Sequence, residues 1–264
     1  MTFLEALILG IVQGLTEFLP VSSSGHIELA QKILGADNLK ENEALLSVVL
    51  HAATALSTIV VFRKDILEIV KGLIAKNKTH VMFSLAIIVS MVPAAFVGVF
   101  FDDLLESLFE GNLVLVGSML ILTCMLLLLA DRAKNTEKSV TVKDAFIIGL
   151  AQAVAILPGV SRSGATISTA VMLGIDRAKS ARFSFLMVVP LILGKMAKDI
   201  IDGKFSFTSE LATPLAVGFV SSFITGIIAC LWMIALVKRA KLSWFAFYCL
   251  AVGIMALVWG LGLV

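Results

Sequence analysis

Two polar segments, each interrupted by proline and glycine, recur in the two halves of an otherwise apolar chain. The first, Gln13–His26, has the sequence QGLTEFLPVSSSGH, and the second, Gln152–Thr166, has the sequence QAVAILPGVSRSGAT. Gly10 recurs as Gly149, and the Val-Ser-x-Ser-Gly motif recurs at the same spacing of 139 residues. A repeat this long predicts two half-domains of related fold rather than a solenoid of short units.

The rest of the chain is too apolar for a soluble protein. Of its 264 residues, 59% are hydrophobic and 15% are charged, against about 25% charged residues in soluble domains. We therefore predict an all-α integral membrane protein. Six apolar runs have about the ~20 residues that a spanning helix needs. They are Ala44–Phe62, Val81–Phe101, Leu113–Ala130, Phe183–Ile201, Leu211–Val237 and Trp244–Val264.

Charge and cysteine content exclude other classes. The net charge of +2 argues against a nucleic-acid partner. Cys124, Cys230 and Cys249 are odd in number and widely spaced, which indicates neither a disulfide framework nor a zinc site. The first apolar run has no preceding Lys or Arg, so we expect no cleaved signal peptide.

The polar segments themselves are poorly suited to spanning helices. Glu17 and His26 are costly against lipid, and Pro20 and Gly25 interrupt helical hydrogen bonding. Broken backbone at membrane depth is tolerated where protein or a water-filled cavity surrounds it. We predict a re-entrant helical hairpin at about residues 1–34 and a second at about 142–174.

Each hairpin is followed by three predicted spans, which divides the single membrane domain, 1–264, into halves 1–135 and 136–264. Because three is an odd number, the second half is expected to be inverted relative to the first, as in an inverted-topology repeat. In such folds the functional site lies near the bilayer midplane, where the broken helices meet.

Basic residues orient the chain. Fifteen fall on one side of the predicted spans and five on the other, so the positive-inside rule places the first side in the cytoplasm. Both termini and the mouth of the first hairpin then face outward, as does the loop with Asp102, Asp103, Glu106 and Glu110. The fifteen are Arg63, Lys64, Lys71, Lys76, Lys78, Arg132, Lys134, Lys138, Lys143, Arg177, Lys179, Arg182, Lys238, Arg239 and Lys241. The five are Lys32, Lys40, Lys195, Lys198 and Lys204.

Gln13 and Glu17 are four residues apart, so they share one helix face. A carboxylate at membrane depth must be paired, bind a cation or be protonated. Such oxygen ligands suit a hard divalent cation, Mg²⁺ or Ca²⁺. Glu17 is a candidate metal ligand or general base with Gln13 as a second ligand. The alternative is a carboxylate that only locks the fold by hydrogen bonding.

A hydroxyl-rich turn precedes the second half-helix of the first hairpin. It consists of Ser22, Ser23, Ser24 and Gly25. N–H groups at a helix N-terminus attract anions, so the turn is predicted to bind phosphate. A serine there could be a nucleophile whose proton passes to His26 or Glu17, and His26 is itself a candidate nucleophile, acid or base. Simple N-capping is the alternative. His51, in the run VVLHAAT, is expected to be a packing residue.

Arg162 lies in the second turn, between Ser161 and Ser163. Its permanently charged, planar guanidinium requires an anion and suits phosphate. The hydroxyls of Ser161, Ser163 and Thr166 could bind the same anion. The alternative is a buried salt bridge with Glu17 and no catalysis. A phosphate site at membrane depth predicts a lipid with a phosphate head as substrate.

These segments resemble the two signature motifs of the bacterial undecaprenyl-diphosphate phosphatases, the bacitracin-resistance (BacA-type) family. The first motif has an acidic residue or Gln, three residues and then Glu, which matches Gln13 and Glu17; the second, P-G-x-S-R-S-x-x-T, is matched from Pro158 to Thr166. The resemblance covers the length, spans and duplication of the whole chain. It implies hydrolysis of undecaprenyl diphosphate in the bacterial plasma membrane, which recycles the lipid carrier for peptidoglycan and confers bacitracin resistance.

The resemblance also implies divalent-cation dependence and a site that opens outward. Glu17 and Gln13 would serve the metal or act as base, and Arg162 would hold the diphosphate. Ser23 and His26 compete for the role of nucleophile, and we favour Ser23, with His26 handling protons. Gln13 stands where some members have Glu, which removes one negative charge from the cation site. Assisting hydroxyls would be those of Ser161, Ser163 and Thr166.

Two other classes of function compete. Inverted repeats with broken helices are typical of transporters, so a transporter or flippase of a phosphate-headed lipid is the alternative. A carrier needs no nucleophile, whereas serines and a histidine adjoin Glu17. A structural scaffold does not explain charged residues at depth in both halves. The oligomeric state is left open, with a homodimer as one option.

Overall fold

The structure, a computed structural model, describes residues 1–35, 43–101, 105, 107–108, 112–134, 136–201, 209–238 and 241–263. Their regular secondary structure is helical, apart from one parallel β-bridge between Lys138 and Ile175. The predicted all-α class is thereby confirmed for the described residues. The helices are α1 (Phe3–Phe18), α2 (Ser23–Leu34), α3 (Glu43–Val61), α4 (Arg63–Ile74), α5 (Lys78–Phe100), α7 (Leu113–Asp131), α8 (Val142–Val154), α9 (Arg162–Met172), α10 (Arg177–Ile201), α11 (Ser209–Lys238) and α12 (Ser243–Gly260).

Four helices in the described part of the chain are long and apolar enough to cross a membrane: α5, α7, α11 and α12. α3 gives a fifth span when it is joined to α4, from which it bends by 73°. These helices confirm a multi-pass membrane protein. The sixth predicted span lies in α10, which is not among them. Its uncharged stretch between Arg182 and Lys195 is shorter than the ~20 residues that a straight span needs.

The polar segments break the helices where the sequence predicts. α1 and α2 pack together as one helical hairpin, and α8 and α9 as the other. Residues 19–22 connect the first pair and residues 155–161 connect the second. The turns that hold the candidate residues therefore lie at the tips of two hairpins.

The first helix of each hairpin packs on the opposite half of the chain. α1 makes its most extensive contact with α11, and α8 with α5. A Cβ built on Gly10 of α1 would lie 2.5 Å from the carbonyl oxygen of Gly218, and one built on Gly149 of α8 would lie 2.5 Å from that of Ser90. Because these two glycines are related by the repeat, the repeat of sequence is also a repeat of close helix packing.

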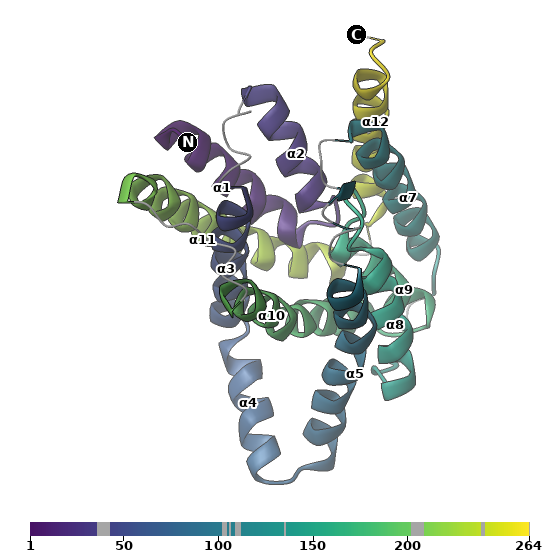
Figure 1. The fold of residues 1–264 in the computed structure, drawn as a ribbon. Coiled ribbons are helices and arrows are strands. Elements are labelled where there is room, and N and C mark those ends of the chain that lie inside the picture. The colour runs from purple at the N-terminus through teal and green to yellow at the C-terminus, as the bar shows by residue number, and fades with distance from the viewer. Residues whose placement is uncertain are drawn as a thin grey trace.

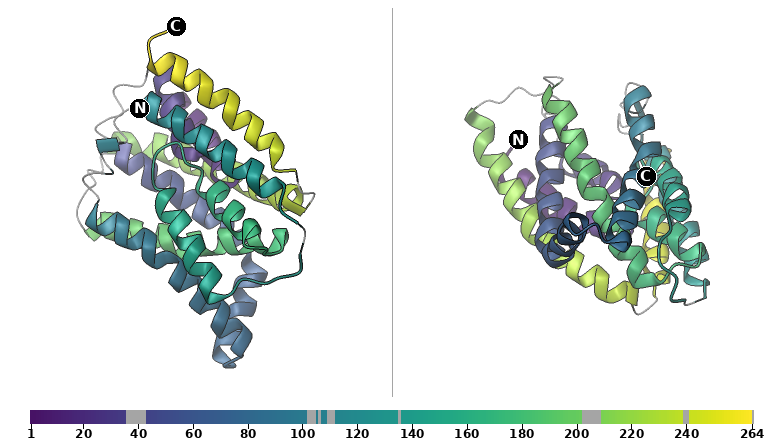
Figure 2. Two further views of the ribbon diagram at one scale, coloured as in Figure 1. Left: turned by 90° about the vertical axis from the view of Figure 1, so that its right-hand side faces the viewer. Right: turned by 90° about the horizontal axis from the view of Figure 1, so that it is seen from below.

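α7 and α12 lie side by side and close one flank of the molecule (Figures 1 and 2). The main hydrophobic core lies against them and includes Val116 of α7, Ile167 of α9, Phe185 of α10 and Cys249 of α12. This core holds the tips of both hairpins from one side. α4 and the first part of α5 project away from this body (Figure 1).

Some residues that the sequence assigns to loops are helical in the structure or lie outside its described part. The basic segment after the first predicted span is not a loop, because it forms α4, where Asp65 pairs with Arg182 of α10 at 2.6 Å. Other predicted loop residues lie outside the described part of the chain: Asp102, Asp103, Glu106, Glu110, Lys40, Lys204 and Arg239.

Candidate active site

The two turns meet at the carboxylate of Glu17, in the last turn of α1. Its side chain is only 6% exposed. One oxygen, Oε1, accepts a hydrogen bond from Arg162 Nη2 at 2.5 Å. The other, Oε2, accepts hydrogen bonds from Ser23 Oγ at 2.7 Å and from Gln13 Nε2 at 3.0 Å. The two hairpins therefore form one site, as the sequence predicts, and the Glu17–Arg162 salt bridge that we considered is present.

Ser23 and Arg162 hold equivalent places in the repeat. Each is the first residue of the second helix in its hairpin, α2 or α9. Each follows an N-cap serine, and each sends its side chain to Glu17. Related positions thus supply a hydroxyl to one oxygen and a guanidinium to the other oxygen of a single carboxylate.

The caps of the two helices are also alike. Ser22 Oγ accepts a hydrogen bond from the backbone N–H of Gly25 at 3.3 Å, and Ser161 Oγ accepts one from that of Gly164 at 3.0 Å. N-capping, the alternative function for the serines of the first turn, is therefore present at Ser22, and Ser161 caps the second turn in the same way. Each cap hydroxyl also lies 3.3 Å from the hydroxyl of a second serine, which is Ser24 in the first turn and Ser163 in the second.

The first turn contains a strained residue. Ser22 has φ 71° and ψ 100°, a backbone conformation rarely adopted by residues other than glycine. Its counterpart Ser161 has an ordinary extended backbone with φ −74°. The strain is therefore particular to the turn that presents Ser23 to Glu17.

The remaining hydroxyls of the second turn bond within the protein. Ser163 Oγ donates to the carbonyl of Leu19 at 3.2 Å and so ties the second turn to the first. Thr166 Oγ1 donates to the carbonyl of Arg162 at 2.8 Å and lies 2.6 Å from Ser184 Oγ of α10. These contacts hold the backbone of the turn in place.

His26 lies on the other side of the first turn. Its Nδ1 is 2.8 Å from the carbonyl oxygen of Ser22, and its Nε2 is 2.9 Å from the hydroxyl of Tyr248 in α12. None of the polar contacts found among the described residues joins His26 to Ser23 or Glu17. The predicted pairing of His26 with the serine nucleophile is therefore absent from this structure.

Two residues outside the motifs lie beside the site residues: His51, which we expected to be a packing residue, and Tyr248, which neither motif includes. His51 Nε2 lies 3.8 Å from Glu17 Oε2, and Nδ1 lies 2.7 Å from the carbonyl oxygen of Ser47. The structure thus brings His51, which we expected to be a packing residue, close to Glu17, and its polarity within an apolar run was the available signal. Tyr248 is the only tyrosine in the chain. Nothing local in the sequence connects it with His26, which is 222 residues away.

A small pocket separates the Glu17–Arg162 pair from α3 and α10. Its volume is about 10 Å³, room for about one water molecule. Thr54 of α3 and Ser184 of α10 line it beside the ion pair. A diphosphate does not fit into this space.

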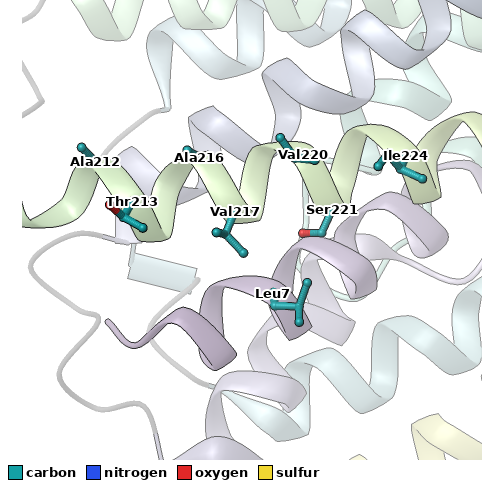
Figure 3. Close-up of a pocket in the computed structure, with 8 residues that line it drawn as sticks. All are labelled: Leu7, Ala212, Thr213, Ala216, Val217, Val220, Ser221 and Ile224. Atoms are coloured by element: carbon teal, nitrogen blue, oxygen red, sulfur yellow. The ribbon is translucent and has the colours of Figure 1, made fainter.

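A larger cavity of about 590 Å³ lies elsewhere, between α1 and one face of α11 (Figure 3). Its lining has no titratable side chain, so it is not the catalytic site. The lining residues are Leu7, Ala212, Thr213, Ala216, Val217, Val220, Ser221 and Ile224.

Arg162 keeps capacity for a second anion. Nη2 is bonded to Glu17, but Nη1 is buried and has no hydrogen-bond partner in the structure. A buried guanidinium N–H without a partner is costly. A phosphate oxygen bound at Nη1 would remove that cost, which fits the predicted anion site.

The donor set fits a divalent cation only when substrate supplies further oxygens. No group of three or more His, Cys, Asp or Glu side chains able to hold a metal occurs among the described residues. Glu17 offers a carboxylate oxygen, and Gln13, which now donates to Glu17, could offer its amide oxygen after rotation. Mg²⁺ is commonly held by one or two carboxylates together with substrate phosphates, and such a shared site matches these residues.

Comparison with known proteins agrees with the geometry. A family model described as "Bacitracin resistance protein BacA" matches residues 6–255, which include both turns. A curated undecaprenyl-diphosphatase from Christiangramia forsetii is 58% identical over 98% of this chain and 98% of its own length. An undecaprenyl-diphosphatase from Parabacteroides distasonis is 47% identical over 97% of this chain and 98% of its own length. One from Carboxydothermus hydrogenoformans is 40% identical over 98% of this chain and 97% of its own length.

Proposed function

The chain belongs to the bacitracin resistance protein BacA family, and from this premise we propose how its two turns carry out the reaction. It is an undecaprenyl-diphosphatase, which releases inorganic phosphate from undecaprenyl diphosphate and returns undecaprenyl phosphate to the pool of lipid carrier. The observation that carries the assignment of residues is the convergence of Ser23 and Arg162 on Glu17.

Ser23 is the nucleophile in this proposal. Its hydroxyl already donates to Glu17 Oε2 at 2.7 Å, the geometry of a nucleophile with its general base. Ser23 Oγ forms a bond to the terminal phosphorus, Glu17 takes the proton, and the bridging P–O bond breaks to release undecaprenyl phosphate. Water then attacks the phosphorus, the bond between Ser23 Oγ and phosphorus breaks to release inorganic phosphate, and Ser23 recovers its proton from Glu17.

Arg162 changes partner when substrate binds. The pocket beside the Glu17–Arg162 pair is too small for a diphosphate, so the guanidinium must move from the carboxylate to phosphate oxygens. That movement frees Glu17 to act as base at the moment when phosphate arrives. In this proposal the Glu17–Arg162 salt bridge is the arrangement without substrate, and the catalytic arrangement has Arg162 on phosphate and Glu17 free.

The other polar groups of the turns serve the phosphate less directly. Backbone N–H groups at the starts of α2 and α9 can donate hydrogen bonds to phosphate oxygens, with the cap serines and glycines shaping both turns. Ser161, Ser163 and Thr166 assist by holding the backbone of the turn from which Arg162 projects. A divalent cation, Mg²⁺ or Ca²⁺, would be held by Glu17 and Gln13 and would neutralise charge on the diphosphate when bound.

We also propose the predicted membrane arrangement of six spans and two re-entrant hairpins in inverted halves. Its support is the exchanged packing of α1 on α11 and of α8 on α5, with repeat-related glycines at both contacts. The distribution of basic residues favours a bacterial plasma-membrane protein whose first hairpin opens to the outer side. Light scattering in detergent would decide whether the chain forms a homodimer.

Phosphate release from undecaprenyl diphosphate by the purified protein, with and without EDTA, tests the mechanism. We expect Ser23→Ala, Glu17→Ala and Arg162→Ala each to lower the rate by about 100-fold or more, the scale of a lost base or charge contact. Ser118→Ala, whose hydroxyl bonds only within α7, is the matched control and should be unaffected. Acid quenching with labelled substrate should trap phosphate on Ser23, and activity of Ser23→Ala near the wild-type rate would refute the nucleophile.

A lipid flippase remains the second candidate because hairpins exchanged between two halves also suit alternating access. Vesicles loaded with a phosphate-headed lipid separate the two functions. If the protein is a flippase, Ser23→Ala should move lipid across the vesicle membrane at the wild-type rate. If it is a phosphatase, no lipid movement is expected in either protein, and Ser23→Ala should lose phosphate release.

A further inference from the structure

The contacts of His26 differ from those of a residue that exchanges protons with Ser23. A carbonyl oxygen only accepts, so Nδ1 of His26 carries the hydrogen and donates it to Ser22 at 2.8 Å. In the neutral ring Nε2 is then an acceptor, and the hydroxyl of Tyr248 donates to it at 2.9 Å. The two rings also lie nearly parallel, at an angle of 11° with centroids 5.6 Å apart. Both ring nitrogens are therefore occupied.

The acceptor of the Nδ1 hydrogen bond is the strained residue of the turn. Ser22 has φ 71°, and its carbonyl accepts both the His26 side chain and the His26 backbone N–H at 3.2 Å. Two hydrogen bonds to one carbonyl fix the orientation of the peptide plane that joins Ser22 to Ser23. That plane sets the direction in which the Ser23 hydroxyl leaves the chain.

α12 fastens the same turn at a second point. Cys249, the neighbour of Tyr248, is fully buried, and its thiol lies 3.6 Å from the carbonyl oxygen of Pro20. Adjacent residues of the last helix thus hold the turn through Pro20 and through His26. The helix that closes the second half of the chain therefore sets the conformation of a turn in the first half.

We propose that Tyr248 and His26 are positioning residues that hold the strained Ser22 peptide and thereby aim Ser23 at Glu17. The proposal rests on the proposed function, in which Ser23 is the nucleophile. The chain of contacts runs from Tyr248 to His26 Nε2, from His26 Nδ1 to the Ser22 carbonyl, and from Ser23 Oγ to Glu17. His26 transfers no proton in this scheme.

Kinetics of the full-length protein in detergent test the positioning. Tyr248→Phe keeps the ring and removes only the hydroxyl, so kcat should fall about three- to tenfold, the effect of one hydrogen bond, with KM unchanged. Phe247→Leu, at an exposed neighbouring position of α12, is the control and should match wild type. An unchanged kcat, or a raised KM with unchanged kcat, would overturn the proposal, because the second result means that Tyr248 contacts substrate.

Substitutions of His26 separate positioning from proton transfer. The amide nitrogen of asparagine can replace Nδ1–H, whereas the amide of glutamine reaches only the place of Nε2. We expect His26→Asn to retain most activity and His26→Gln to lose as much as His26→Ala. Equal loss in all three, with rescue of His26→Ala by added imidazole, would show that His26 handles protons.

A spectroscopic readout keeps this test independent of catalysis. The chain has three histidines, so ¹⁵N signals of labelled protein can be assigned by substitution. His26 should show a protonated Nδ1 and a bare Nε2 in wild type and in Ser23→Ala, and a mixture of tautomers in Tyr248→Phe. An active Ser23→Ala variant with these signals intact would refute the nucleophile while leaving the tautomer contact established. Signals that do not change in Tyr248→Phe would refute the positioning itself.

Discussion

Substitution of Gly10 by alanine tests how tightly the candidate base is held. Gly10 faces α11, where a new Cβ would lie 2.0 Å from Ser221 Oγ and 2.5 Å from the carbonyl oxygen of Gly218. The serine side chain can rotate away, but the backbone carbonyl cannot. α1 must then move away from α11, and it carries Glu17 with it.

The size of the movement follows from the distances. An ordinary contact begins at 3.4 Å, so the gap of 2.5 Å must open by 3.4 − 2.5 = 0.9 Å. Overpacking of this kind typically costs about 1–3 kcal/mol. A displacement of about 1 Å near a reacting group can lower a rate by as much as about 100-fold. We therefore expect Gly10→Ala to lower both thermal stability and phosphate release.

Gly98→Ala and Gly194→Ala are the matched controls, since a Cβ at either position meets nothing within 4 Å. Each replaces a helical glycine in open space, which should stabilise by about 0.5–1 kcal/mol. Thermal unfolding in detergent and the phosphate-release assay measure both effects on all variants. Gly149→Ala, with its Cβ 2.5 Å from Ser90, should behave like Gly10→Ala. A Gly10→Ala protein as stable and active as the controls would refute the close packing of α1 on α11.

Two further predictions concern charged pairs. Glu17→Gln or Arg162→Met alone leaves a buried charge without its partner, so each should destabilise the fold by about 3–5 kcal/mol. The double variant should be destabilised by clearly less than the sum of the two single losses. Additive losses in a double-mutant cycle measured by thermal unfolding would contradict the pairing. Asp144 is partly desolvated, but hydrogen bonds from Lys138 and Thr141 outweigh this and lower its pKa. Its stabilising contribution is therefore present above the pKa of an unfolded Asp and is lost as pH falls through the lowered value in the folded protein. Asp144→Asn should flatten the fall in melting temperature below about pH 4, and an unchanged pH profile would contradict the contact.

Much of the candidate site could be predicted because the sequence marks it twice. In an apolar chain, each charged residue at depth needs a partner, and the repeat states which segments can supply one. The two segments were therefore expected to meet, and the salt bridge between Glu17 and Arg162, which the sequence offered as the alternative to phosphate binding, joins them at 2.5 Å. The caps at Ser22 and Ser161 follow from local turn chemistry in the same way.

Contacts that residues outside the two motifs make with the site could not be predicted from the sequence. His51 reaches Glu17 from α3 and Tyr248 reaches His26 from α12 only because of helix packing, which local sequence does not specify. The bend of 73° between α3 and α4 was also missed, since hydropathy records where an apolar run ends and not which way the chain then turns. The partners of His26 were likewise not predicted, because they are a backbone carbonyl and a distant tyrosine.

The repeat also explains why the two turns make one site and not two. The caps are the same in both halves, but the position of Glu17 falls in the second half at Ala155 or Ile156, depending on where the single deletion is placed. Only the first half therefore brings a carboxylate to the meeting point. The halves also differ at one further pair of related positions, which holds Ser23 in the first half and Arg162 in the second. These two side chains bind different oxygens of the Glu17 carboxylate. The two halves therefore differ at the positions to which we assign a base, a nucleophile and a phosphate-binding cation, and share the capped turns around them.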